Sequence, residues 1–252
     1  MFSNLSARYD LSDLGHAIMT ARFKFQEVLD EPEVFRLPWS YVFELLKDGR
    51  TPVRVITDEA MKFYHKFLIG DGTIFELSAP SDYYKSFFPE SQKYVLTNIA
   101  KNADMVVDMT SMPFDDDSVD AMLSMFAVEH IADYRRGFTE VHRVLKPKGR
   151  FLVCVPFMYC YHAAPDDYVR FTTSYLRTLM ADFDLLTVRT LGTREVMIAN
   201  MYHEKVWMQL DNSRLSRFFK RVLGSLILIK YLIRPSVDET FYPAVLVLAE
   251  KK

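Results

Sequence analysis

From residue 73 onward, short apolar runs alternate with segments of helical periodicity, and this alternation restricts the fold more than any other feature. Short apolar runs without a polar face are typical of strands that are buried on both sides. Strands separated by helices pair in parallel, and helices then cover both faces of the sheet. We therefore predict a doubly wound α/β domain that binds ligands at the carboxyl ends of its strands. The predicted strands cover 73–77, 93–99, 104–108, 119–125, 149–156, 183–192 and 242–250, and helices cover 81–88 and 133–145.

The first third of the chain has a different, mostly helical pattern. Apolar residues at helical spacing predict one helix over 11–30, and a later helix is expected to take Thr57 or Asp58 as its N-cap. We predict a helical N-terminal extension or lid over 1–70 and the α/β domain over 71–252. A helix is also predicted over 38–47, with Trp39, Val42, Phe43 and Leu46 turned inward.

Composition excludes several classes of protein. The 252 residues carry a formal net charge of -2, which gives no electrostatic reason to expect a nucleic-acid partner. The N-terminus lacks a basic segment followed by an apolar core, so no signal peptide is predicted. No run of about 18 uncharged apolar residues predicts a membrane-spanning helix. Cys154 and Cys160 are expected to be free thiols, and a cytoplasmic location is predicted.

The segment 214–234 is basic and amphipathic. It contains six basic residues and no acidic residue. Such a helix can lie at the surface of an anionic membrane. The alternative is a helix that packs on the domain or forms a homo-oligomer with a second copy of the chain. Its apolar part is too short to span a bilayer.

Residues 104–172 contain the most specific motifs. An acidic residue precedes "MPF", and "DDSVDAMLS", "VEHIAD" and "EVHRVLKPKGRFLVCVP" follow in that order. These motifs resemble class I S-adenosylmethionine-dependent methyltransferases, in particular the type 11 branch. The resemblance runs from about residue 73 to the C-terminus. It implies a Rossmann-like, mostly parallel seven-stranded sheet with an antiparallel last strand, and S-adenosylmethionine across strands one to four.

The resemblance also identifies residues for the cofactor, with two departures from the family pattern. Glu76 stands at the acidic position of the first strand, but Ser78, Ala79 and Pro80 stand where the family has glycines. Proline has no backbone N–H, so that donor to a cofactor is lost. Asn98 replaces the carboxylate that would accept hydrogen bonds from the ribose. S-adenosylmethionine is the expected cofactor, and these two departures leave open the alternative that its binding is weak or lost.

Three further positions match the cofactor region of the family. Asp108 and Met109 match the step that faces the adenine, although a solvated loop acid or a cap is the alternative for Asp108. Phe126 follows the fourth strand, where cofactor and acceptor would meet. The "GDG" at 70–72 precedes the first strand and therefore lies at the wrong end of the sheet for a cofactor turn.

Glu129 and His130 follow Phe126 in the motif "VEHIAD". His130 is a candidate general base because an imidazole titrates near neutral pH, and its alternative role is to structure the turn. Neither the histidines nor the cysteines have the spacing of zinc ligands, so the sequence predicts no metal site.

The loop after the fifth strand, "HAAPDDYVRFT" over 162–172, resembles a feature of some of these methyltransferases. His162 and Tyr168 are predicted to contact substrate or take part in catalysis. Asp167 and Arg170 either bind substrate or form an ion pair that braces the loop. Tyr161 adds to the aromatic side chains that could close around a cation or a flat substrate, a set that core or lid packing explains equally well.

The sequence thus predicts an S-adenosylmethionine-dependent methyltransferase that acts on a small-molecule or lipid-linked acceptor. The alternative is a methyltransferase-fold protein that has lost methyl transfer, either a cyclase or isomerase or a non-catalytic partner subunit. The two coincident departures, at the glycine turn and at Asn98, are the features that favour this alternative.

Overall fold

The computed structural model of the chain describes residues 30–46, 50–78, 81–99, 103–163, 165–202 and 213–252. The chain divides into two units, Met1–Pro32 and Glu33–Lys252, and the fold below is that of the second unit. All but the last residue of the helix predicted over 11–30 lies outside the described residues.

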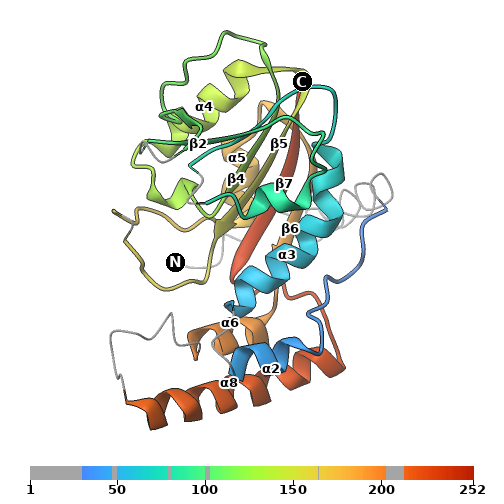
Figure 1. The fold of residues 1–252 in the computed structure, drawn as a ribbon, viewed down its shortest axis with the longest axis vertical. Helices are drawn as coiled ribbons and strands as arrows, with labels where there is room; N and C mark the ends of the chain where they lie inside the picture. Colours follow the sequence, from blue (N-terminus) through green and yellow to red (C-terminus); the bar gives the residue numbers. More distant parts are fainter. Residues whose placement is uncertain (1–29, 47–49, 79–80, 100–102, 164, 203–212) are drawn as a thin grey trace, which may run out of the picture. The chain divides into compact units, whose positions relative to one another are not determined.

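Seven strands form one sheet in the order β3-β2-β1-β4-β5-β7-β6. Figure 1 labels β2, β4, β5, β7 and β6. β7 runs antiparallel to both of its neighbours, and the other pairings are parallel. This confirms the predicted architecture. The strand order reverses between β1 and β4, which is where open sheets of this kind bind ligands. The strands are β1 Ile74–Glu76, β2 Tyr94–Asn98, β3 Met105–Val106, β4 Val119–Met125, β5 Leu145–Pro156, β6 Phe183–Leu191 and β7 Ala244–Lys251.

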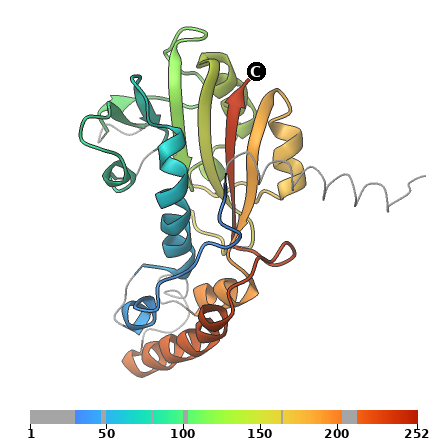
Figure 2. The ribbon, with the colours of Figure 1, turned by 90° about the vertical axis from the view of Figure 1, so that its right-hand side faces the viewer.

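Helices flank the sheet and also gather at one end of it. Figures 1 and 2 show α2, α6 and α8 next to one another beyond one end of the sheet. α3 begins at that end and runs along the sheet. The helices are α2 Tyr41–Leu46, α3 Pro52–Tyr64, α4 Tyr134–Val144, α5 Thr173–Leu179, α6 Arg194–Met201 and α8 Arg214–Ile233, and 3-10 turns cover η1 His65–Phe67, η2 Tyr84–Phe87 and η3 Val128–His130. The helix predicted over 81–88 was therefore wrong, because only the short 3-10 turn η2 forms there.

The core lies on both faces of the central strands. Phe151 and Val153 of β5 are fully buried in the cluster that contains Phe138 of α4. Side chains alternate along a strand, so Cys154 points the other way, toward Thr57 of α3. Cys154 and the exposed Cys160 are both free thiols, as predicted.

The predicted start of α3 was wrong. The helix begins at Pro52, and the side chain of Thr51 accepts a hydrogen bond from the Arg54 amide as the N-cap. A threonine followed by proline is itself a start signal, because proline at the first helical position loses no needed donor. Thr57 and Asp58 lie buried inside the helix instead.

The predicted inward face of the helix over 38–47 was also wrong. Trp39 and Phe43 are 58% and 67% exposed, and Leu46 is exposed as well. Tyr41 and Leu45 are the buried residues of α2. The helix has only six residues, too few for apolar spacing to establish its phase.

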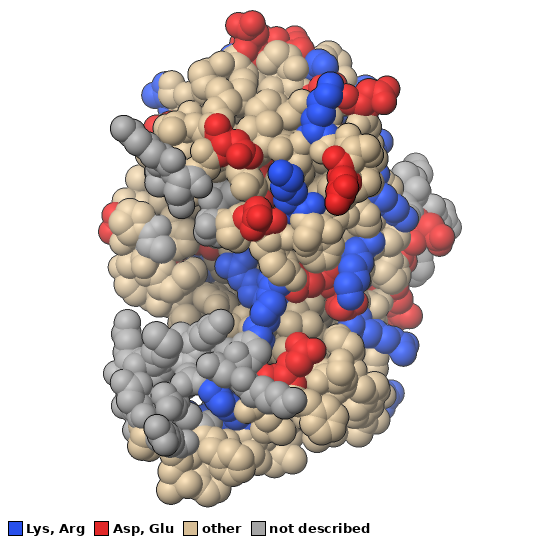
Figure 3. All heavy atoms as spheres, viewed as in Figure 1, with Lys and Arg blue, Asp and Glu red and all other residues tan. Residues whose placement is uncertain are grey.

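α8 carries an exposed apolar face. Leu228 and Tyr231 are buried on the side that packs against the rest of the unit. Within the described ranges, no helix has the length and apolarity needed to cross a bilayer. The surface near α8 at the lower end of Figure 3 shows few charged side chains. Its exposed large apolar residues, here called the α8 stripe, are Leu215, Phe218, Phe219, Leu223, Leu226 and Ile233.

Candidate functional site

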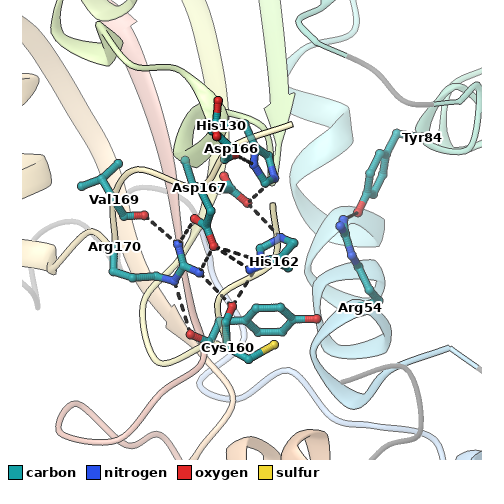
Figure 4. A network of polar contacts seen from close by, with 11 residues as sticks. Arg54, Tyr84, His130, Cys160, His162, Asp166, Asp167, Val169 and Arg170 are labelled. Atoms are coloured by element: carbon teal, nitrogen blue, oxygen red, sulfur yellow. Dashed lines mark hydrogen bonds and ion pairs between the residues drawn. The ribbon is translucent and has the colours of Figure 1, made fainter. Parts of the chain in front are cut away.

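Two loops meet at the carboxyl edge of the sheet. The turn η3 follows β4, and the segment 157–172 follows β5. The Tyr168 amide donates to the Glu129 carbonyl over 2.8 Å, which ties the second loop to the first. The rings of His130 and His162 consequently lie 4.9 Å apart in an edge-to-face arrangement, as Figure 4 shows. Two histidines far apart in the sequence thus share one site.

Glu129 lies between the two histidines. Its side chain has no exposed surface, and its Oε1 lies 3.9 Å from His130 Nε2 and 4.0 Å from His162 Nε2. Among the described residues, neither carboxylate oxygen of Glu129 has a hydrogen-bond partner. Burial raises the pKa of this carboxyl to about 7, against the opposing effects of the nearby backbone amide of Glu129 itself and of His130, Arg54 and Arg170. The sequence motif contains this residue but does not show that it is buried.

Both imidazoles have a defined orientation. His130 Nδ1 lies 2.6 Å from the Asp166 carbonyl, and His162 Nδ1 lies 3.2 Å from the Cys160 carbonyl. A carbonyl oxygen only accepts, so we assign the proton of each neutral ring to Nδ1. Each Nε2 then presents a lone pair toward Glu129. Burial lowers the pKa of His162, which favours this neutral form.

Asp167 and Arg170 form the ion pair that was one of the two expected interpretations. The Asp167 side chain is 1% exposed and binds both terminal nitrogens of the Arg170 guanidinium. It also accepts a hydrogen bond from the His162 amide over 2.8 Å. Arg170 donates to the Cys160 carbonyl as well, over 2.8 Å. These contacts brace the loop and position His162, and the Arg170 guanidinium lowers the pKa of Asp167 to about 2.

Tyr161 and Tyr168 lie at the outer side of this loop. Their exposed fractions are 73% and 52%. The Tyr168 hydroxyl donates to the Asp166 carboxylate over 3.1 Å, within its own loop. The structure does not bring the Tyr168 hydroxyl into the histidine pair, because the backbone of Tyr168 makes the contact with Glu129.

Arg54 is a site residue that the sequence did not reveal. Its guanidinium lies 4.1 Å from the centre of the Phe126 ring, and its Nη1 donates to the Tyr84 hydroxyl over 3.4 Å. Figure 4 shows Arg54 and Tyr84 across from His162. The predicted helix began after Arg54, so the sequence analysis did not place this residue on a helix. A single arginine inside the apolar run "PVRVI" was the available signal.

The end of β1 has a buried acid and a strained turn. Glu76 is 1% exposed and accepts a hydrogen bond from the Tyr94 hydroxyl over 2.6 Å, and burial raises its pKa to about 7. Ser78 has a φ of 56°, in the left-handed region that favours glycine. The turn therefore keeps a glycine-like backbone conformation at Ser78. Ala79 and Pro80 lie outside the described residues.

The positions expected to contact the nucleoside differ in exposure. Asn98 ends β2 and is half-buried. Asp108 is exposed, and its Oδ1 accepts from both the amide and the hydroxyl of Thr110 over 2.8 Å. The Met109 side chain is 3% exposed and packs beside Gly137 in the core, so only the backbone of Met109 could contact a cofactor.

The sequence family described as "Methyltransferase domain" matches residues 83–153. A demethylmenaquinone methyltransferase from Clavibacter sepedonicus is 47% identical over 47 residues, which are 19% of this chain and 19% of that protein. The chain thus spans about a fifth of the length of this curated relative.

Solved structures match over most of the chain. The [4+2]-cyclase SpnF covers 84% of this chain and 92% of its own, with a TM-score of 0.52 and 12% identity. A geranyl diphosphate C-methyltransferase from Streptomyces coelicolor A3(2) covers 89% and 87%, with a TM-score of 0.53 and 15% identity. Residues 83–153 are thus similar to methyltransferase domains, and the chain as a whole has the fold of these solved structures. A methyltransferase and a cyclase share its fold, so the fold alone does not select the reaction.

For a class I methyltransferase, the ends of β1 and β4 are the edge at which the cofactor is expected. Near this edge Glu76 supplies a buried carboxyl group and Arg54 a partly buried guanidinium group. The backbone conformation at Ser78 allows a cofactor to approach the turn closely. These groups fit the charged amino-acid part of S-adenosylmethionine. A hollow of about 400 Å³ lined by "GDG" at 70–72 lies at the opposite edge, beside the start of β4.

Proposed function

We propose that this chain is an S-adenosylmethionine-dependent methyltransferase that acts on a small-molecule or lipid-linked acceptor. The observation that carries this proposal is the pair of oriented imidazoles, His130 and His162, at the carboxyl edge of a methyltransferase-fold sheet. Two imidazole Nε2 atoms close to one buried carboxylate make a site that can take up a proton from an acceptor.

The chain's own groups would hold the cofactor at two ends. Arg54 would bind the carboxylate of the methionine part, because guanidinium and carboxylate form strong charge-assisted hydrogen bonds. Glu76 would lie near its ammonium group, and Asn98 would accept from the ribose. Asp108 would face the adenine. When bound, S-adenosylmethionine supplies a methyl group that is already activated for transfer to a nucleophile.

His130 or His162 would remove the proton from an acceptor hydroxyl at Nε2. Glu129 would then stabilise the imidazolium, at a distance of 3.9 to 4.0 Å in both cases. General-base catalysis of this kind contributes about 10²–10⁴-fold. The remaining acceleration would come from positioning of the acceptor, for which Tyr161 and Tyr168 offer aromatic surface at the mouth of the site.

Calorimetric titration with S-adenosylmethionine and with its demethylated product tests the proposal. We expect Arg54→Met to weaken binding by about 10–100-fold, since hydrogen bonds to charged groups contribute about 1.5–3 kcal/mol. Arg136→Met, at an exposed position of α4, is the matched control and should leave the affinity unchanged. Asn98→Asp should strengthen binding, because a carboxylate accepts the ribose hydroxyls more strongly.

Absence of binding at millimolar cofactor would overturn methyl transfer. It would instead support a cyclase or isomerase, or a non-catalytic partner, built on the same fold. Asn98, in place of a carboxylate, is the observation that favours this second candidate. Cofactor binding together with methyl transfer to a hydroxylated aromatic or prenylated acceptor would exclude it.

We further propose that the α8 stripe rests on an anionic membrane surface. Six large apolar side chains are exposed along one helix, and the segment 214–234 has six basic residues and no acidic one. Lys230 is exposed next to the stripe, and its ammonium group pairs with Glu195 over 2.5 Å. This arrangement suits anionic lipid head groups. The demethylmenaquinone and geranyl diphosphate enzymes named above act on hydrophobic compounds, which is consistent with a lipid-linked acceptor here.

Sedimentation with vesicles tests this contact. We expect binding to vesicles of phosphatidylglycerol and phosphatidylcholine, and weaker binding to phosphatidylcholine alone. Leu226→Glu should reduce binding at least tenfold, whereas Ile99→Glu, at another exposed apolar position, should not. Equal effects of the two variants would contradict the proposal. A stable dimer that Leu226→Glu dissociates would also contradict it.

A further inference from the structure

We propose that Glu129, His130 and His162 bind a divalent first-row transition metal ion of the zinc type. Each residue offers one ligand atom, and the three atoms lie within 4.8 Å of one another. The sequence did not predict this site, because its ligands come from two loops and lack the local spacing of zinc motifs.

The buried carboxylate is the first argument. Glu129 is fully buried, and among the described residues neither of its oxygens accepts a hydrogen bond. His130 Nε2 and His162 Nε2 lie 3.9 and 4.0 Å from its Oε1, beyond hydrogen-bond distance. A buried carboxylate with no partner is costly unless it is paired or coordinates a metal. A cation between the three side chains would satisfy it.

The orientation of the imidazoles is the second, independent argument. Histidines that bind metals donate their other ring nitrogen to a carbonyl or carboxylate, which fixes the ring and its tautomer. His130 and His162 both do this, through the carbonyls of Asp166 and Cys160. Asp167, tied to Arg170, also holds the His162 backbone. Both Nε2 lone pairs therefore converge on Glu129 before any ion is present.

The distances require a small closure. Zinc bonds of about 2.0–2.2 Å place neighbouring ligand atoms about 3.3 Å apart in a tetrahedral site. The two pairs that involve Glu129 would each shorten by less than about 1 Å, and the two histidine nitrogens, which lie within 4.8 Å of each other, by at most about 1.5 Å. His162 lies on a loop and is 35% exposed, so this side chain can make the adjustment.

The ligand set selects the class of metal. Two imidazoles and one carboxylate suit zinc, cobalt, iron or manganese, whereas magnesium and calcium prefer oxygen ligands. Three protein ligands leave a coordination position open, as in catalytic zinc sites. An acceptor hydroxyl or enol could occupy that position and lose its proton more easily. This last step rests on the proposed methyl transfer and would replace proton removal by His130 or His162, because a bound metal occupies their Nε2 lone pairs. Metal binding itself does not rest on the proposed function.

Cobalt(II) is the probe that we would use, because its visible absorption reports four- or five-coordinate binding. Tag-free protein is first treated with a chelator, and the cobalt titration is followed by competition with zinc. We expect a 1:1 complex. His162→Gln and Glu129→Gln should each weaken it by roughly 100-fold or more, since loss of a group that only orients a metal ligand already costs about 10–100-fold. His142→Gln, a histidine packed on Phe183, is the control.

Each result decides the proposal. Absence of a 1:1 complex, or a complex that His162→Gln leaves unchanged, overturns it. Thermal unfolding identifies a misfolded Glu129→Gln variant, and the result then depends on His162→Gln alone. S-adenosylmethionine binding is measured in parallel on the chelator-treated protein. Failure of the metal site and failure of the proposed methyltransferase are therefore distinguishable.

Discussion

Replacing Asp167 by asparagine should destabilise the protein in a way that depends on pH. The carboxylate is 1% exposed, binds the Arg170 guanidinium through both oxygens and accepts from the His162 amide. Asparagine keeps the shape and one acceptor but removes the charge. The substitution therefore isolates the electrostatic part of the brace.

The pKa of Asp167 gives the magnitude. It is about 2 in the folded protein, whereas an aspartate in an unfolded chain has a pKa of about 3.9. The difference corresponds to about 2–3 kcal/mol of folding free energy at pH 7. Because the folded pKa is the lower one, this contribution is present above pH ~4 and is lost as the pH falls through 2. At pH 3, about half of it remains.

Urea unfolding followed by circular dichroism measures this effect. With an m-value of about 2.5 kcal/mol/M, Asp167→Asn should lower the midpoint by about 1 M at pH 7. Asp116→Asn is the matched control, because Asp116 pairs with Arg143 over 2.7 Å but is 73% exposed. An exposed pair should contribute less than about 1 kcal/mol.

Two outcomes would refute the reasoning about Asp167. One is an equal loss of stability in Asp167→Asn and Asp116→Asn at pH 7. The other is a difference between wild type and Asp167→Asn that stays constant from pH 7 to pH 3. Either would mean that the ion pair does not stabilise the loop through its charge.

Two further substitutions test the local structure. Ser78→Gly should raise the free energy of unfolding by about 1 kcal/mol, because Ser78 has a φ of 56°. The control Ser91→Gly lies in an exposed turn without a positive φ and should lower the free energy of unfolding. A change of the same sign in both variants would contradict this view. Thr172→Ala should cost about 1 kcal/mol in thermal or urea unfolding, because its hydroxyl caps α5 at the Tyr175 amide over 3.1 Å. Thr178→Ala in the same helix should cost nothing, and equal losses would show that the cap is unimportant.

The alternation of apolar runs and helices was sufficient to predict the sheet. β4 and the end of β5 lie where the sequence placed them, because a strand buried on both faces must be apolar along its whole length. α4 was predicted from the helical periodicity of its residues. The antiparallel direction of β7 followed from the family resemblance. These properties depend on neighbouring residues and can be read locally.

Short elements and helix starts were harder to predict. α2 has only six residues, so its sequence does not show which face is buried. The burial of Tyr41 and the exposure of Trp39 depend on the elements against which α2 packs. The start of α3 at Pro52 was a local signal that could have been found, since Thr51 precedes it. Because this helix start was missed, Arg54 was not recognised as a residue of α3.

The sequence by itself determined the fold class, the carboxyl edge as the place for chemistry and the individual candidates His130 and His162. Only the tertiary structure brought these two histidines together over Glu129 and added Arg54 from α3. The physical reason is that parallel strands end at a common edge, so loops distant in sequence become neighbours there. Which side chains then meet, and which of them lose contact with water, depends on packing between elements, and a single sequence does not record it.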